Sequence, residues 1–332
     1  MSHQSTRTTP NRMTSSATIA LRVPELHIVT GAFGYTGRYI AEELLSRGHR
    51  VRTLTNSTHR PDPFGGRVEV HPIDFGDHAA LTASLRGAAA FYNTYWVRYD
   101  HGDGPRTFGY AQAVQNTRSL FGAARDAAVP RVVHVSVANA ERGTTWDYFR
   151  EKAQLERELR SSGLSHAIVR PTIVFGGERN VFINNIAWML RHFPVFGLVG
   201  RGRARVTPIH VRDVARVCVD AAKRRGDEVV DAGGPETITY RDMVRTISRG
   251  LGVRRLILPM PAPVVIGIGW ILGKAMGDVV ITSHEISGLR DELMFLPGPA
   301  VGRISLAESV SQERDTLGRT YRNDLAERGF PH

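Results

Sequence analysis

A short apolar segment that runs into three evenly spaced glycines limits the folds open to this chain most strongly. Residues 26–30 read Leu-His-Ile-Val-Thr, the following residues 38–47 are amphipathic, and a second apolar segment covers 50–55. Between the first two segments lie Gly31, Gly34 and Gly37. The pattern predicts a strand, a tight turn, a helix and a second strand, which is a βαβ unit of a parallel sheet.

The glycine turn also predicts a ligand. Glycines allow a ligand to approach the backbone closely, and the start of a helix offers free N–H groups and the positive end of the helix dipole. An anion such as the pyrophosphate of a dinucleotide fits such a turn. The residues predicted to contact it are Gly31, Phe33, Gly34, Tyr35, Thr36 and Gly37.

Strand-like and helix-like segments continue to alternate through the first half of the chain, which predicts an α/β fold with a Rossmann-type doubly wound parallel sheet. Asp77 and Thr239 are predicted to begin helices as N-caps, and residues 206–209 are predicted to form a strand. The domain organisation predicted from these patterns is a disordered basic tail over 1–24, a dinucleotide-binding domain over 25–175 to which 206–232 returns, and a smaller, mostly helical lobe formed by 176–205 and 233–332.

Composition excludes several classes of function. The formal net charge is +11, but the basic residues are scattered, and only three of the 43 Lys and Arg residues are lysines. Because no basic stripe is interleaved with aromatic residues, we expect no nucleic-acid partner. Cys218 is the only cysteine, so an intramolecular disulfide and a cysteine-based metal cluster are excluded. No histidine pair has metal-ligand spacing beside a carboxylate, so we expect no metal. The single cysteine fits a reducing compartment, so we expect a cytoplasmic protein.

Residues 262–276 form the most apolar segment. The segment is short and rich in glycine for a membrane span, so we expect a helix of the lobe. A peripheral contact of this helix with a membrane or with a protein complex stays open.

Tyr148 and Lys152 are four residues apart on a predicted helix and therefore share one face. A phenol is a poor acid–base catalyst near neutral pH unless a neighbouring cation lowers its pKa, and Lys152 would supply that cation and bind the nicotinamide ribose. Ser136 follows a predicted strand, where its hydroxyl could orient a substrate oxygen. These three residues are the candidate catalytic group.

Taken together, these motifs resemble a short-chain dehydrogenase/reductase of the extended or atypical type. Within that superfamily the chain is similar to the NAD(P)-binding group that includes an accessory subunit of respiratory complex I, and more distantly to sugar-nucleotide epimerases and dehydratases. The resembling residues are Thr30-Gly31, Gly34, Gly37, Asp74, Asn116-Thr117, Val133 to Ser136, Tyr148, Lys152, Arg170 to Gly176, Pro208 to Ala215 and Gly233 to Glu236.

The resemblance implies site residues. It implies the three glycines around the pyrophosphate, Asp74 near the adenine, Pro171 in a turn beside the nicotinamide, and Ser136, Tyr148 and Lys152 as the catalytic group. Phe75 and Asn93, which come after predicted strands, complete the predicted cofactor contacts.

The end of the second strand bears on the choice of cofactor. An acidic residue there would bind the ribose 2′-hydroxyl of NAD, but residues 53–60 contain no acid. Thr55 and Asn56, with Arg60 or Arg52 nearby, could hold a 2′-phosphate instead. The sequence therefore favours NADP over NAD.

The preferred function is an NAD(P)-dependent oxidoreductase that moves a hydride at a carbonyl or alcohol of a small molecule. Two alternatives stay open: a non-catalytic NADP(H)-binding sensor or assembly protein, and a sugar-nucleotide epimerase or dehydratase. The substrate itself is not readable, because its contacts would come from residues 93–105, 176–205 and the last hundred residues.

Overall fold

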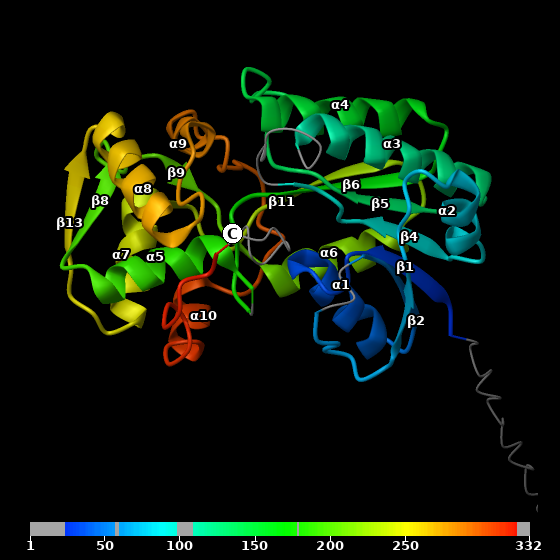
Figure 1. Cartoon of the computed structure of the whole chain (residues 1–332), viewed down its shortest axis with the longest axis horizontal. Coiled ribbons are helices and arrows are strands. Elements are labelled where there is room, and N and C mark those ends of the chain that lie inside the picture. Colours follow the sequence, from blue (N-terminus) through cyan, green and yellow to red (C-terminus); the bar gives the residue numbers. More distant parts are fainter. Residues whose placement is uncertain (1–23, 57–59, 98–108, 178, 324–332) are drawn as a thin grey trace, which may run out of the picture.

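The computed structural model describes residues 24–56, 60–97, 109–177 and 179–323. Figure 1 shows a sheet flanked by helices in one part of the molecule and a second, mostly helical group of elements beside it. The predicted tail over 1–24 and part of the predicted substrate loop, 98–105, lie outside the described residues, Pro24 excepted. The division of the chain into two domains stays a prediction.

Seven parallel strands form the main sheet, in the order β11-β6-β5-β4-β1-β2-β3. The strands are β1 (Leu26–Thr30), β2 (Arg50–Leu54), β3 (Val68–His71), β4 (Ala90–Asn93), β5 (Val132–Val135), β6 (His166–Pro171) and β11 (Glu228–Ala232). The strand order reverses between β1 and β4, and ligands of such sheets bind outside the carboxyl ends of the strands at that point. The predicted fold class is confirmed.

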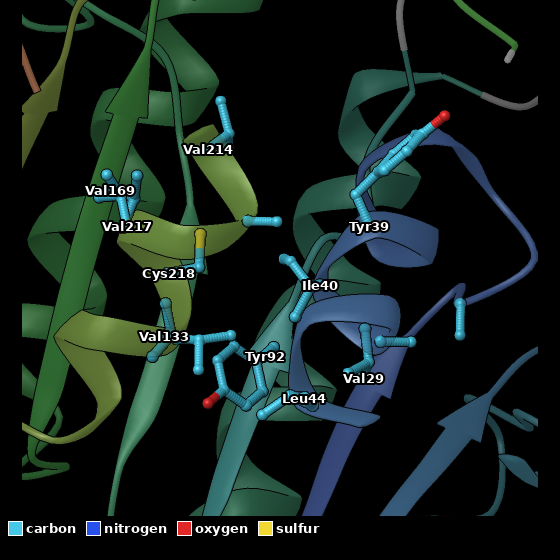
Figure 2. Packing of buried hydrophobic residues seen from close by; sticks show 14 of the residues in the cluster. Val29, Tyr39, Ile40, Leu44, Tyr92, Val133, Val169, Val214, Val217 and Cys218 are labelled. Carbon is cyan, nitrogen blue, oxygen red and sulfur yellow. The ribbon is translucent and has the colours of Figure 1, made fainter. Parts of the chain in front are cut away.

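Helices cover both faces of the sheet because neighbouring strand residues point to opposite sides. On one face lie α1 (Tyr35–Ser46) and α6 (Val211–Ala222), and on the other lie α2 (His78–Leu85), α3 (Tyr110–Asp126) and α4 (Asp147–Ser161). Figure 2 shows the first face, where Ile40 and Leu44 of α1 and the buried Cys218 of α6 lie close to the sheet residues Val133 and Tyr92. The second face buries Ile28, Phe91, Val132 and Ile168.

The remaining elements either belong to the group beside the sheet or connect the sheet to that group. They are β7 (Val174–Phe175), α5 (Val181–His192), β8 (Val195–Val199), β9 (Arg205–Val206), β10 (Ile209–His210), β12 (Ile238–Thr239), α7 (Tyr240–Gly250), β13 (Leu256–Met260), α8 (Ala262–Met276), α9 (Ser283–Arg290) and α10 (Leu306–Gln312). Their own apolar core includes Ile186, Leu198, Val244 and Leu306. Residues 262–276 form a helix as expected, and among the described helices none is long and apolar enough to cross a membrane.

The predicted strand over 206–209 is wrong. The chain forms two separate short strands there, β9 and β10, which pair with β12 and β7. Pro208 lacks an N–H and separates them, while Thr207 donates its N–H to Met294 O at 3.0 Å and Ile209 donates to Ile173 O at 2.9 Å. Both predicted N-caps are confirmed, since the Asp77 side chain accepts from Ala80 N and the Thr239 side chain accepts from Asp242 N.

Candidate functional site

The glycine turn packs so tightly against the start of α1 that a side chain is excluded at Gly37. Gly31 has a φ of +65°, which favours glycine, and its carbonyl accepts a hydrogen bond from Gly34 N at 2.8 Å. A Cβ on Gly37 would lie 2.4 Å from Gly31 O. The turn is fixed to the next strand by Ala32 N, which donates to Thr53 Oγ1 at 2.9 Å. The first residues of α1 are therefore held close to the end of β1.

Helix α1 begins at Tyr35, and its N-cap residue Gly34 has no side chain that could cap the first turn. Backbone N–H groups of this turn, which includes the predicted contact residues Tyr35 and Thr36, are thus available to an anion. The Tyr35 hydroxyl points elsewhere: it donates to Gly176 O at 2.9 Å and accepts from Asn180 Nδ2 at 3.0 Å. Burial raises the pKa of this phenol well above its usual value, so it stays a neutral donor.

At the end of β2 the structure distinguishes the two arginines named from the sequence. Arg60 Nη1 donates to Phe33 O at 3.3 Å, which brings a cation to the glycine turn. Arg52 instead donates to Ser84 O at 2.8 Å and pairs with Glu69 at 3.0 Å. Arg60 is therefore the guanidinium that lies beside the turn.

Several other predicted cofactor contacts have their polar atoms engaged within the protein. Asn56 exchanges two hydrogen bonds with the backbone of Ile73, at 2.6 and 2.9 Å, and Thr55 N donates to His71 O at 3.0 Å. Asp74 is exposed and accepts from Gly76 N at 2.8 Å. These bonds fix the loops after β2 and β3.

Aromatic and amide groups fix the loop after β4. The Phe75 ring lies 5.0 Å from the Tyr95 ring. The fully buried Asn93 accepts from Tyr95 N at 3.0 Å and contacts His134 Nδ1 at 3.2 Å. Burial lowers the pKa of His134 well below its usual value, so this histidine is neutral.

Helix α4 carries both Tyr148 and Lys152. Lys152 is only 2% exposed; its Nζ donates to Val135 O at 3.0 Å and lies 4.2 Å from the centre of the Trp96 ring. Burial disfavours the cation and lowers the pKa of Lys152 to about 7, although the charge of Glu156 opposes this shift and the carbonyl and the ring also favour the cation. The pKa of the Lys152 ammonium, which is well above neutrality in water, thus lies near neutral pH in the folded protein.

This burial predicts a pH-dependent stability. Between the lowered pKa of about 7 and the usual 10.5, Lys152 binds more protons in the unfolded chain than in the native one, so its contribution to the stability of the wild type rises with pH across that range. Lys152→Met removes this effect. We expect the free energy of unfolding of the ligand-free variant, relative to that of wild type, to be about 4 kcal/mol higher at pH 6 than at pH 10. Chemical unfolding at several pH values measures it, and a constant difference would contradict the assignment.

Tyr148 is half-buried among aromatic rings. The ring centres of Trp96, Tyr110 and Phe149 lie 6.2, 6.0 and 5.3 Å from its own. Tyr148 also lines a cavity of about 210 Å³, together with Val137 from beyond β5. Sequence reasoning placed Trp96 only within the predicted substrate loop 93–105, without a role, and missed Tyr110, which begins α3.

The other two predicted residues of this group lie at the ends of strands. Ser136 follows β5 and donates its N–H to Val169 O at 2.8 Å, and its buried Oγ has no hydrogen-bond partner. Ser136 does not line the 210 Å³ cavity, whereas its neighbour Val137 does. Pro171 ends β6, where its carbonyl accepts from Ala138 N at 2.9 Å. The structure thus joins the loops after β5 and β6 beside α4.

One group of side chains outside this site has metal-ligand chemistry. The ligand atoms of Glu25, His27 and His49 lie within 4.8 Å of one another at the amino ends of β1 and β2. The sequence pattern missed this trio because the pairing of β1 with β2 brings His49 next to β1. The expectation that the protein holds no metal stays a prediction.

A parallel sheet whose switch point carries an uncapped glycine turn defines a dinucleotide-binding protein of Rossmann type. The chain belongs to the NAD(P)H-binding family, whose match covers residues 31–225. This result confirms the NAD(P)-binding group suggested by the sequence, while the short-chain dehydrogenase type stays a prediction.

The chain is also similar in sequence to individual reductases and oxidoreductase subunits. The chain is 25% identical over 266 residues to the mitochondrial 40 kDa subunit of NADH-ubiquinone oxidoreductase from Neurospora crassa, covering 78% of this chain and 68% of that one. It is 31% identical over 230 residues to a (4-alkanoyl-5-oxo-2,5-dihydrofuran-3-yl)methyl phosphate reductase of Streptomyces griseus, covering 68% and 73%.

Solved structures share the fold. An NADPH-dependent quinone oxidoreductase of Escherichia coli in complex with NADPH matches with a TM-score of 0.68 at 18% identity, over 86% of this chain and 99% of that one. A nucleoside-diphosphate-sugar epimerase of Staphylococcus aureus also matches with a TM-score of 0.68, at 14% identity and the same coverage. Both likenesses concern the fold.

Proposed function

We propose that the protein is an NADP(H)-dependent oxidoreductase that reduces a carbonyl group, or oxidises the corresponding alcohol. The observation that carries the proposal is the position of Tyr148, on the wall of a cavity and one helical turn before the buried Lys152. An acid–base group and a cation in this order are what a carbonyl reduction needs beside a hydride donor.

The cofactor would supply and accept the hydride. In reduction, the Tyr148 hydroxyl donates its proton to the substrate oxygen as negative charge develops there. Lys152 donates one hydrogen bond to Val135 O and keeps further N–H donors for a ribose hydroxyl. In its charged form it also favours the phenolate left by proton transfer. The aromatic rings around Tyr148 exclude water from the reacting atoms.

The test is the consumption of NADPH with a panel of aldehydes, ketones and quinones, followed by identification of the products. We expect turnover of at least one carbonyl class and transfer of deuterium from labelled NADPH to the product carbon. Tight NADPH binding without turnover of any member would contradict the proposal. A tightly retained NAD in the purified protein would instead favour an epimerase or dehydratase.

Arg60 supports the preference for NADP, because it brings a guanidinium to the glycine turn, and residues 55–60, which follow β2, contain no acid. We expect Arg60→Ala to weaken NADPH binding about 10- to 100-fold, which is the loss of one or two charge-assisted hydrogen bonds, and to leave NADH binding nearly unchanged. Titration calorimetry with both cofactors measures the change.

Arg50→Ala is the matched control, because this exposed arginine begins β2 and therefore lies at the amino ends of the strands, opposite the glycine turn. It should leave both affinities unchanged. An equal loss of NADH and NADPH affinity in Arg60→Ala would mean that Arg60 supports the turn and does not select the cofactor.

A second candidate is a non-catalytic NADP(H)-binding assembly protein. Two observations favour it: the similarity to a subunit of a respiratory complex and the exposed apolar residues of α8, of which Trp270 is 61% and Ile271 62% exposed. Co-purification of a defined partner with the tagged native protein, lost in a Trp270→Glu/Ile271→Glu variant, would support this function. A monomer that reduces carbonyls unaided would contradict it.

A further inference from the structure

A large apolar cavity lies beneath α8, away from the glycine turn. Its volume is about 350 Å³, within the range of small-molecule sites. Walls come from α5 through Ile186 and Met189, and from α8 through Val265 and Leu272. A cavity with such walls binds its ligand by burial of apolar surface.

Two lining residues carry polar side-chain groups, and neither changes this character. The Asn185 amide is engaged with the backbone of Arg322, donating at 2.8 Å and accepting at 2.9 Å. The Tyr240 hydroxyl belongs to a buried residue, and burial raises the pKa of this phenol. The cavity therefore offers no charge to a ligand.

The cavity beneath α8 adjoins the cavity that Tyr148 lines. Phe182 and Leu289 belong to the walls of both. These two side chains stand where the cavities meet, so a molecule with a polar head at Tyr148 and a long apolar part would have to pass them to continue beneath α8.

The outer wall of the cavity is apolar on both sides. Ile268 lines the cavity and is also 44% exposed, and the neighbouring Val264 and Ile271 are exposed to solvent. A helix that is apolar all round normally has lipid or protein on every side. Here α8 lies between an apolar cavity and the molecular surface, and its outward side chains are largely apolar as well. An apolar ligand therefore meets apolar side chains both at this surface and inside the cavity.

We propose that the substrate carries an aliphatic or prenyl chain, that this chain occupies the cavity beneath α8, and that its carbonyl end lies at Tyr148. The proposal rests on the proposed function for the reacting end, whereas the chain site is a property of the cavity alone. Each CH₂ group that enters the cavity should raise affinity by up to about fourfold until the cavity is filled.

Binding is tested without turnover by titrating the protein with a fluorescent polyene fatty acid and displacing it with saturated fatty acids of increasing length. We expect affinity to rise with chain length and then level off. Leu272→Trp, which fills the cavity, should weaken binding at least tenfold, and Val265→Phe should act in the same direction. Ile271→Trp, the adjacent residue on the exposed side of α8, is the control and should bind as wild type does.

Affinity that is independent of chain length, or equal in the Leu272→Trp and Ile271→Trp variants, would overturn the proposal. NADPH binding and turnover of short aldehydes are measured in parallel. If they persist while chain binding fails, the oxidoreductase function stands and only the chain site is wrong.

A turnover assay distinguishes whether the apolar substrate comes from a lipid surface or from solution. A long-chain aldehyde is offered either as a monomer or within phosphatidylglycerol vesicles. Faster turnover from vesicles assigns the source to a lipid surface, and equal turnover assigns it to the free amphiphile. Both results require a long chain to outperform a short one, and loss of that advantage would overturn the proposal.

Discussion

Tyr148→Phe is expected to lower kcat/KM for carbonyl reduction about 10²- to 10⁴-fold while the affinity for NADPH changes less than twofold. The substitution removes one oxygen atom and leaves the ring in place between Trp96, Tyr110 and Phe149. Without the hydroxyl, the developing negative charge on the substrate oxygen has no proton donor of matched geometry. Steady-state kinetics and fluorescence titration of NADPH measure the two quantities.

Tyr92→Phe is the matched control for the loss of a phenol. Tyr92 is fully buried between the sheet and α1, and its hydroxyl contacts His27 at 3.2 Å near the opposite edge of the sheet. This variant should lose some stability and keep its activity. If Tyr148→Phe and Tyr92→Phe retain equal activity, Tyr148 has no part in proton transfer.

Gly37→Ala is expected to weaken NADPH binding at least 100-fold and to destabilise the protein by about 1–3 kcal/mol. The added Cβ would meet Gly31 O at 2.4 Å, Gly31 C at 2.8 Å and Thr30 O at 2.9 Å. All three are backbone atoms of the turn, so no side chain can move aside. The start of α1 must then shift away from β1, and the N–H groups that we predict to bind the pyrophosphate lose their positions.

Gly122→Ala is the matched control, because Gly122 lies within α3 and its added Cβ would make only an ordinary contact of 3.6 Å with His78. Alanine favours helix, so stability should hold or increase and NADPH binding should be unchanged. Equal NADPH affinity in both variants would mean that the glycine turn does not hold the cofactor. Thermal unfolding with and without NADPH separates stability from binding.

The parts of the fold that depend on local signals could be predicted from the sequence. The apolar segments 26–30 and 50–55 gave their strands because both are buried and lie next to turns, and Asp77 and Thr239 marked helix starts because a short polar side chain there accepts a backbone hydrogen bond. The pairing of β8 with β13 could not be predicted, since its partners lie about sixty residues apart and carry no turn that joins them.

The site followed the same division. Helical spacing placed Tyr148 and Lys152 on one face, but the burial of Lys152 depends on Trp96, which comes from a distant loop. In the same way, the sequence alone does not distinguish Arg52 from Arg60 as a ligand of a 2′-phosphate. The structure does, because Arg52 pairs with Glu69 on the neighbouring strand. Strand pairing thus decides which arginine is engaged away from the glycine turn, and no short motif carries that information.

One hydrogen bond described above joins the two halves of the proposed reaction. Asn180 accepts from Ile183 N at 3.0 Å as the cap of α5, and donates at 3.0 Å to the Tyr35 hydroxyl of α1. Helix α1 begins at the cofactor turn, and α5 forms a wall of the cavity beneath α8. If the two sites are coupled, the coupling is reciprocal. The factor by which bound NADPH changes the affinity for the apolar ligand equals the factor by which the bound apolar ligand changes the affinity for NADPH. The shared factor is the same whichever ligand binds first, so titrating either ligand in the presence of the other measures it.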